Sequence, residues 1–318
     1  MTRGRLLAVG ICLAAMHLSA LFPGFLAPYG YAEQHRDFPY AAPAHLHWAG
    51  LRPFVYGIEP TADGYREDLR CSYPIHFFGH GKLFQVEDPG VLFLLGTDAY
   101  GRDVFSRVLY GARISILTGL LAALVSLGVG WGLGTLAGFS GGWVDQALMR
   151  GSELFMALPW LYLLLAVRAF LPLHIDPTQA FFLLVGIIGG VGWVRPARLI
   201  RAVVLSVRER PYVLAARGFG AGSWYLVRCH ILPFTWGVTL TQATILIPQY
   251  ILAEVTLSFL GLGIGEPLPS WGNMLAEARQ YHALAGHIWL LAPGVAAMPI
   301  LLGYLVLADS FAAHRSAE

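Results

Sequence analysis

The side chains that most often carry out catalysis are few and widely separated in this 318-residue sequence. Five of the eleven histidines fall in one segment: His35, His45, His47, His76 and His80. His45 and His47 could bind a metal ion, but exposure to solvent in a loop is the simpler interpretation. The cysteines, Cys12, Cys71 and Cys229, are too far apart to indicate a disulfide framework or a metal site. We therefore expect neither a metal site nor a catalytic residue, and the chain is predicted not to be an enzyme.

The sequence also lacks the motif that binds the phosphates of ATP. A P-loop ends in Gly-Lys followed by Ser or Thr, whereas the only lysine is followed by leucine, in Gly81-Lys82-Leu83. The H-E-x-x-H and G-x-S-x-G signatures of hydrolases are absent as well. No cofactor is expected in this chain, and any ATP that drives it must be bound by a separate subunit.

Three ionisable residues interrupt long apolar runs: His17, Arg168 and Glu254. An ionisable side chain inside a membrane span is costly and usually functional. Glu254 lies near the outer end of its run and is a candidate outer gate. Arg168 can extend its charged end to the membrane surface. His17 is interpreted as a residue that packs against other helices or lies at the membrane interface. The runs hold no series of Asp, Glu and His, which a proton-coupled carrier would often show.

One segment between two apolar runs is amphipathic: YVLAARGFGAGSWYLVRCHILP, residues 212–233. Pro211 suits the first turn of a helix over residues 212–219, and Gly220 suits the left-handed residue that ends it. Ser223 is the predicted N-cap of a second short helix over residues 224–231. The pattern predicts two short helices joined by a glycine turn. Such an element could lie on the membrane surface or dock another protein.

The elements around these residues are predicted to be membrane helices. Hydrophobic residues make up 56% of the chain and charged residues 13%, against about 25% charged residues in soluble proteins. The net charge of +2 is too small to indicate a nucleic-acid partner. A membrane core requires about 20 apolar residues per helix. Six spans are predicted: residues 6–26, 114–144, 152–171, 177–194, 232–262 and 288–308.

Glycines four residues apart recur in the second and fourth predicted spans. The second span holds Gly128, Gly130, Gly132, Gly134 and Gly138, and the fourth holds Gly186 and Gly190. This spacing lets helix backbones approach closely in lipid. The contacting helix belongs either to the same chain or to a partner subunit, and both alternatives stay open.

The distribution of arginines predicts the orientation of the spans. Residues 195–228 hold seven arginines and a single acid, Glu209, and cytoplasmic loops are enriched in basic residues. This segment and both termini are therefore predicted to be cytoplasmic. Residues 27–110, 172–178 and 263–286 are predicted to lie outside.

The segment 212–233 resembles a motif of binding-protein-dependent ABC importer permeases. That motif reads Glu-Ala-Ala, three residues, Gly, nine residues, an aliphatic residue, one residue and Leu-Pro. Here Ala215-Ala216, Gly220 and Leu232-Pro233 fall in register. Three further segments are similar to C-type permease subunits of dipeptide, oligopeptide and nickel importers: LGTDAYGRDVFSRVLYGARIS (95–115), LAEVTLSFLGLG (252–263) and PSWGNML (269–275).

The resemblance covers about residues 90–300 and implies an all-α membrane protein with the type I ABC importer permease fold. It implies six transmembrane helices, a long extracytoplasmic segment after the first, and a place in the inner membrane of a prokaryote. The implied partners are a second permease in a heterodimer, two ATP-binding subunits, an extracytoplasmic binding protein and membrane lipid. The implied ATPase-coupling residues are Ala215, Ala216, Arg217, Gly220, His230, Leu232 and Pro233. The motifs leave open whether the solute is a peptide, nickel or another small molecule.

The sequence departs from the family pattern at several positions. Leu214 stands in place of the usual Glu and Phe234 in place of a frequent Asn, and the C-terminal tail lacks the usual acidic and basic ending. The segment 27–94 is longer than the family requires. An extra small subdomain is expected there, with a modest core of Trp48, Phe54, Tyr56, Phe77 and Phe78. This segment, with Trp48, and the loop 263–286, with Trp271, are expected to face the binding protein.

The organisation expected from the sequence has four parts. They are a transmembrane anchor (1–29), an extracytoplasmic segment (30–110), a permease domain (111–310) with a cytoplasmic coupling loop at 195–233, and a cytoplasmic tail (311–318). A stand-alone secondary carrier or channel is the alternative function. A neighbouring gene for a P-loop ATPase, or co-purification with one, would distinguish the two.

Overall fold

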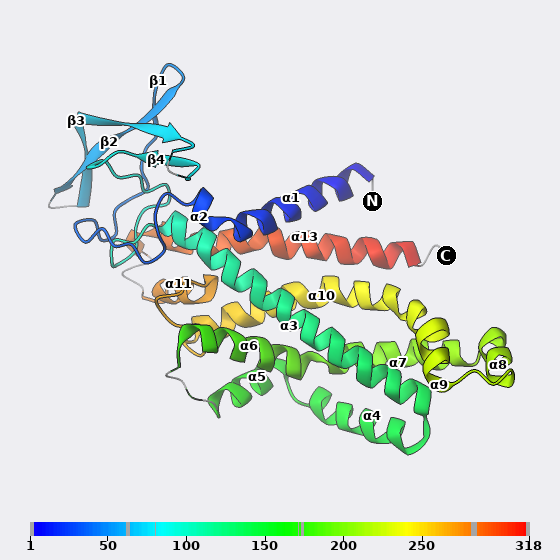
Figure 1. Cartoon of the computed structure of the whole chain (residues 1–318). Coiled ribbons are helices and arrows are strands. Elements are labelled where there is room, and N and C mark those ends of the chain that lie inside the picture. The colour runs from blue at the N-terminus through cyan, green and yellow to red at the C-terminus, as the bar shows by residue number, and fades with distance from the viewer. Residues whose placement is uncertain are drawn as a thin grey trace. The chain divides into compact units, whose positions relative to one another are not determined.

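Figure 1 shows the computed structural model of the chain, which describes residues 3–61, 64–79, 81–170, 172, 175–280 and 285–315. His80 and the tail residues 316–318 lie outside the described residues. The chain divides into two compact units. The first unit comprises Met1–Leu6, Leu117–Glu254 and Gly303–Glu318, and the second comprises Leu7–Ile116 and Val255–Leu302. Four helices contribute residues to both units: α1 (Arg3–Leu21), α3 (Val104–Ser140), α10 (Leu232–Phe259) and α13 (Ala292–Arg315).

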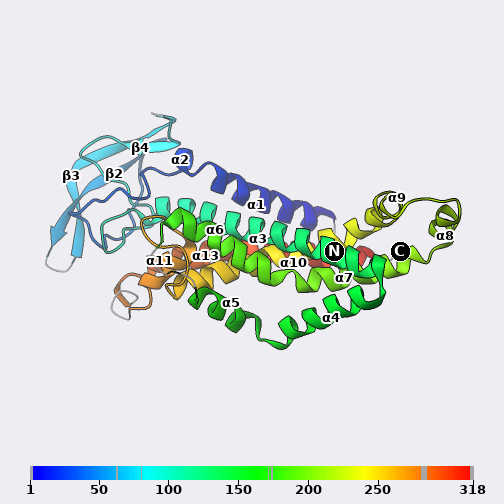
Figure 2. The same cartoon turned by 60° about the horizontal axis from the view of Figure 1, so that its bottom comes forward.

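The remaining elements of the first unit are α4 (Gly142–Ala157), α5 (Trp160–Ala169), α6 (Pro177–Gly192), α7 (Val194–Arg208), α8 (Pro211–Gly218), α9 (Ser223–Tyr225) and a π-helical turn (Leu226–Ile231). Glycine and proline set their boundaries. Gly141, between α3 and α4, and Gly142, the first residue of α4, have φ values of 66° and 56°, which favour glycine. Leu158 is extended because it precedes Pro159, and α4 and α5 therefore meet at 91° (Figure 2).

Helix α7 packs closely against one row of glycines on α3. An added Cβ would lie within 3 Å of α7 at each of the three positions: at Gly130 from Pro196, at Gly134 from Ala197 and at Gly138 from Val204. At Gly128 and Gly132, on the same helix, an added Cβ would meet no atom within 4 Å. The row formed by residues 130, 134 and 138 therefore serves helix packing within this chain.

The second unit contains an antiparallel sheet, so the all-α prediction is wrong for this part of the chain. Its strands β1 (His47–Ala49), β2 (Arg52–Thr61), β3 (Gly64–Phe77) and β4 (Phe84–Val86) lie in that order (Figure 1). Ile58 pairs with Glu67, and the β2–β3 register shifts between Tyr56 and Gly57. Polar residues largely alternate with apolar ones in the second half of β3, and the apolar stretch of β2 is only six residues long, so the segment holds no apolar run of the length that marks a membrane span.

The aromatic core expected for this segment is only partly correct. Phe54 and Tyr56 are half-buried, with ring centres 5.3 Å apart. Trp48, Phe77 and Phe78 are instead exposed. A sheet with two three-residue strands encloses too little volume for five aromatic rings. The second unit also contains α2 (Pro23–Leu26), α11 (Trp271–Glu277) and a 3₁₀ turn (Ile288–Leu291).

Several helices are long and apolar enough to cross a membrane. Among the residues that the structure describes, three qualify as single runs: Val104–Ser140, Ser223–Phe259 and Ile288–Phe311. Counting the bent pairs α4–α5 and α6–α7, the second bent by 43°, as one span each raises the number to five. The first predicted span corresponds to a shorter apolar helix, Leu6–Leu21. The chain is a multi-pass membrane protein, while the count of six spans stays a prediction.

Candidate functional site

The first arm of the segment 212–233 is the helix α8, and it ends in a glycine turn. Pro211 is its first residue. The N–H that proline lacks would have no partner within the helix at this position, so the proline costs no hydrogen bond. At the other end, the N–H of Ala221 donates to the carbonyl of Ala216 at 3.1 Å, and the N–H of Gly220 donates to that of Arg217 at 3.0 Å. Gly220 has φ 88°. This is a Schellman motif, and it confirms the predicted left-handed glycine turn.

The second arm is not a separate short helix, and here the prediction is wrong. Gly222, and not Ser223, holds the N-cap position, and no side chain caps this end. The helix widens into the π turn and continues into α10. The ring of Pro233 would crowd the carbonyl of Cys229, four residues earlier, and Cys229 lies in that wider turn. One helical run therefore leads from the hairpin into α10.

One face of the hairpin is buried in a small core shared with α7. The buried residues of this core are Ile200, Val204 and Val207 from α7, Val213 from α8, and Leu226 and Ile231 from the π turn. Burying one such side chain contributes about 1.5–3 kcal/mol. The core therefore holds both arms of the hairpin against α7.

The other face of the hairpin carries large apolar side chains that are exposed. Phe219 is 93% exposed and Trp224 72%, and Tyr212, Leu214 and Tyr225 are also exposed. A group of this size at one surface usually marks a contact with another protein or a membrane. This exposed face is the candidate functional surface.

The structure places all seven predicted coupling residues in the hairpin or at the start of α10. Ala215, Arg217, Gly220 and Pro233 are exposed, and Ala216, His230 and Leu232 are half-buried. The ring of His230 lies 6.0 Å from that of Tyr212 and 5.5 Å from that of Tyr225, so it contacts both arms. The guanidinium of Arg217 lies 5.9 Å from the ring centre of Phe139 on α3.

Two arginines of α7, which the sequence did not single out, attach the base of the hairpin to α3 and α4. Nη1 of Arg208 donates to the carbonyl of Gly138 at 2.8 Å and to that of Phe139 at 3.4 Å. These carbonyls lie in the last turn of α3, where helical partners are missing. Arg201 donates through Nε and Nη2 to the carboxylate of Asp145 on α4. The sequence shows how many arginines this segment contains, but it does not indicate which helix each arginine contacts.

Glu254, the predicted outer gate, is fully buried on α10. It lies about 32 Å along the helical run from Pro233, at roughly 1.5 Å per residue. The structure therefore does not bring Glu254 to the hairpin, and its role as a gate stays a prediction.

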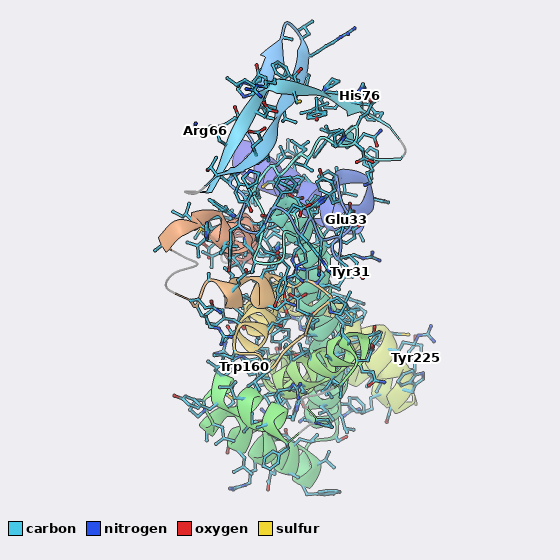
Figure 3. All side chains as sticks on the ribbon, turned by 90° about the vertical axis from the view of Figure 1, so that its left-hand side faces the viewer. Tyr31, Glu33, Arg66, His76, Trp160 and Tyr225 are labelled. Carbon is cyan, nitrogen blue, oxygen red and sulfur yellow. The ribbon has the colours of Figure 1, made fainter. Side chains whose placement is uncertain are left out.

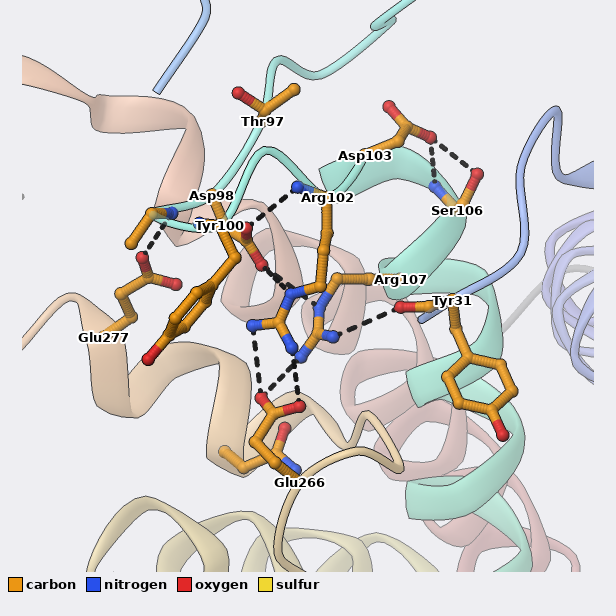
Figure 4. Close-up of polar contacts among 12 residues, drawn as sticks. Tyr31, Thr97, Asp98, Tyr100, Arg102, Asp103, Ser106, Arg107, Glu266 and Glu277 are labelled. Carbon is orange, nitrogen blue, oxygen red and sulfur yellow. Dashed lines mark hydrogen bonds and ion pairs between the residues drawn. The ribbon is translucent and has the colours of Figure 1, made fainter. Parts of the chain in front are cut away.

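A second polar cluster lies in the second unit, within the motif 95–115 (Figure 4). Arg102 donates to Asp98 at 2.6 Å and to Glu266 at 2.7 Å. Arg107 donates to the other oxygen of Glu266 at 2.8 Å. Both arginines are buried. The pair Arg102–Asp98 is buried on both sides, and removing one partner of such a pair typically costs about 3–5 kcal/mol. Glu266 keeps 48% of its side chain exposed, so its ion pairs contribute less. The cluster ties the motif 95–115 to the loop that follows α10, a link that the sequence did not indicate.

Two more contacts join the same segments. The indole N–H of Trp271 donates to the carbonyl of Val108 at 3.1 Å, and the carboxylate of Glu277 accepts from the N–H of Ala99 at 2.9 Å. Trp271 is buried. It therefore cannot contact a binding protein as expected, whereas Trp48 is exposed and stays available.

Asp103, just before α3, is buried beside this cluster. One of its oxygens, Oδ2, accepts from the N–H of Ser106 at 2.7 Å and from its hydroxyl at 2.6 Å. The other, Oδ1, has no hydrogen-bond partner among the described residues. Burial raises the pKa of Asp103 to about 7, although the hydrogen bonds from Ser106 oppose the shift.

Comparison with known proteins agrees with this picture. Residues 130–315, more than half of the chain, match the family described as "Binding-protein-dependent transport system inner membrane component". The chain is 39% identical over 196 residues to the dipeptide transport system permease protein DppC of Bacillus subtilis, covering 62% of this chain and 59% of that protein. It is 34% identical over 237 residues to the glutathione transport system permease protein GsiD of Pectobacterium atrosepticum, covering 74% and 75%.

Among solved structures, this chain is similar to a chain from a structure of the MetNI methionine ABC transporter in inward-facing conformations. The sequence identity is 17% and the TM-score is 0.46. The match covers 65% of this chain and 97% of the other. The family match and the relatives at 34–39% identity carry the assignment. This chain belongs to the family of inner-membrane components of binding-protein-dependent transport systems.

Proposed function

We propose that this chain is one permease subunit of an ATP-driven importer of peptides or a related small solute, and that residues 212–233 form its contact with a separate ATPase subunit. The observation that carries the proposal is the two-sided character of the hairpin. One face is packed on α7, and the other exposes Phe219 and Trp224. The names of the relatives, which include dipeptide and glutathione permeases, support a peptide or peptide-like solute.

A coupling element must bind the ATPase subunit and must also be rigid. Movement of an ATPase reaches the spans only if the hairpin does not bend separately from α7. The shared core, the glycine contacts between α3 and α7, and the hydrogen bonds of Arg208 meet this requirement. Rigid exposed aromatic side chains are also typical of the residues that dominate binding energy at protein interfaces.

The same proposal includes the assembly and its orientation. The chain would form half of a translocation pathway with a second, different permease, together with two ATPases, an extracytoplasmic binding protein and surrounding lipid. The hairpin and both termini would face the cytoplasm, and residues 30–95 the outside, because arginines concentrate at residues 195–228. Labelling of a cysteine at Tyr65 from outside intact cells, and not of one at Gly222, would test this orientation.

The decisive experiment is reconstitution in liposomes with and without the ATPase subunits. Peptide uptake should require the ATPases and ATP, and the double variant Phe219→Ala, Trp224→Ala should fail to retain the ATPases on purification. The double variant Leu51→Ala, Arg52→Ala, which removes exposed side chains from the turn between β1 and β2 and from the start of β2, is the matched control. Uptake by this chain in the absence of ATPases would instead show a stand-alone carrier or channel.

A further inference from the structure

The sheet of the second unit carries a cavity that the proposed coupling does not use. Its volume is about 450 Å³, within the size range of small-molecule sites in proteins. One wall is the extended segment 41–45, which we call the strap, and the other is formed by β2 and β3. The lining residues from the strands are Val55, Tyr56, Ile58, Tyr65, Arg66, Glu67 and Leu69.

Hydrogen bonds hold both walls in place. The N–H of Ala41 donates to Oγ1 of Thr97 at 2.7 Å, and the N–H of Ala44 donates to the carbonyl of Phe93 at 2.8 Å, so the strap is fixed at both ends. On the other side, the hydroxyl of Tyr65 donates to the carbonyl of Pro39 at 2.9 Å, just before the strap. The cavity is therefore preformed, and a ligand would not bear the free-energy cost of ordering its walls.

The strand register places one carboxylate among apolar side chains. Alternate residues of a strand share a face, so Glu67 lies on the same face as Tyr65, and Ile58 is its direct partner on β2. The carboxylate lies 3.1 Å from Nε2 of His47 and keeps 30% of its side chain exposed. A partly exposed carboxylate in an apolar wall favours a ligand with a cationic group.

The neighbouring charge on β3 does not share this wall. Arg66 is exposed and lies on the strand as Figure 3 shows, but consecutive residues of a strand point to opposite faces, so Arg66 and Glu67 lie on opposite sides of β3 although both contribute to the lining. A ligand for the wall of Glu67 therefore carries an ammonium group beside apolar groups. Glu67 would repel a purely anionic solute, and a sugar would leave its carboxylate without a cationic partner.

We propose that this cavity binds a short peptide, with its ammonium group on Glu67 and its apolar side chains against Ile58 and Tyr65. The choice of a peptide rests on the proposed function. The binding itself needs neither the hairpin nor an ATPase, because the whole cavity is built from residues of the second unit.

Binding of trialanine to the purified full-length protein in lipid nanodiscs tests the proposal by calorimetry. Glu67→Gln keeps the size of the side chain and its contact with His47 but removes the charge, and it should weaken binding by about tenfold, or ~1.4 kcal/mol. N-acetylated trialanine should bind weakly, and equally to both proteins. Ile58→Trp, which fills the cavity, should abolish binding. Glu59→Gln, an exposed acid of β2 outside the lining, should bind trialanine as the unmodified protein does.

Equal binding of trialanine and its acetylated form, or binding unchanged by Glu67→Gln and Ile58→Trp, would overturn the proposal. Its failure differs from a failure of the proposed function. ATP-dependent peptide uptake without trialanine binding overturns only the cavity assignment. Trialanine binding that depends on Glu67, in a protein that shows no ATP-dependent uptake with its partners, supports the cavity and contradicts the importer.

Discussion

Nη1 of Arg208 on α7 donates a 2.8 Å hydrogen bond to the carbonyl of Gly138 in the last turn of α3. Gly138 is also a position where a side chain would collide with α7. The same turn of α3 is therefore fixed to α7 by close packing and by a charged donor. Because α7 leads directly into the hairpin, this turn is a place where a force on the hairpin would reach α3.

Replacing Arg208 by alanine should uncouple the transporter without removing it from the membrane. The loss of a hydrogen bond from a charged donor costs on the order of 1.5–3 kcal/mol, and the hairpin could then move separately from α3. We expect normal membrane abundance and a lower ratio of peptide transported to ATP hydrolysed. Arg198→Ala, which removes a half-exposed arginine of the same helix, is the control. An unchanged ratio in Arg208→Ala would show that this contact is not needed for coupling.

The two sets of glycines on α3 should respond differently to substitution by alanine. At Gly134 the added Cβ would lie 2.4 Å from the carbonyl oxygen of Ala197, a backbone atom that cannot turn aside. Such overpacking costs about 1–3 kcal/mol, so thermal unfolding in detergent should occur at lower temperature. Gly128→Ala meets open space and should be neutral or stabilising by up to about 1 kcal/mol. Equal effects at the two positions would contradict the packing of α7 on this row.

Substitutions in the hairpin should abolish coupling while leaving the spans inserted. Gly220→Val places a β-branched residue at φ 88°, at a cost of about 1–2 kcal/mol or a change in the direction of the turn. Ala216→Trp adds bulk at a half-buried position between the arms. Both variants should lose uptake and the stimulation of ATPase activity by the loaded binding protein. Gly222→Ala, at φ −66° with no atom near the added Cβ, should transport normally. Full uptake in both test variants would identify the hairpin as a membrane-surface anchor.

Asp103 should make the protein less stable as the pH rises. Burial raises its pKa to about 7, with a smaller contribution from the charge of Asp98, whereas an unfolded aspartate titrates near 4, roughly. The folded state therefore binds more protons in this window, and stability falls between about pH 4 and pH 7. Asp103→Asn keeps an acceptor for Ser106 and should remove this dependence. Unfolding temperatures measured at pH 5 and pH 8 check it, and an identical pH dependence in both proteins would rule out Asp103 as the source.

Local features of the hairpin could be predicted from the sequence because they depend on backbone preferences of single residues. Pro211 at the start of a helix and Gly220 at a left-handed C-terminal position follow from ring closure and from the missing Cβ. The motif residues Ala215, Ala216 and Gly220 likewise identified the family, which residues 130–315 confirm. The second arm could not be predicted, because its continuation into α10 depends on how the π turn accommodates Pro233.

The sheet of the second unit was missed for a related reason. Strands such as β3 present one polar side chain for each apolar one, and the partner that makes such a strand stable is another strand, not a property of its own composition. The aromatic residues were visible, but which of them would be buried depended on the register of β2 and β3. The apolar runs of the spans, by contrast, are continuous in the sequence and could be recognised by length alone.

The sequence by itself determined that this protein lies in a membrane, that it carries no P-loop, and that a glycine-turned hairpin precedes its fifth apolar run, because each of these depends on consecutive residues. Only the tertiary structure decided which groups the charged side chains meet. Arg208 with Gly138, Arg102 and Arg107 with Glu266, and Glu67 with His47 all join residues far apart in the chain. A charged side chain reaches any partner that folding brings within a few ångströms, and residue spacing along the chain does not encode that distance.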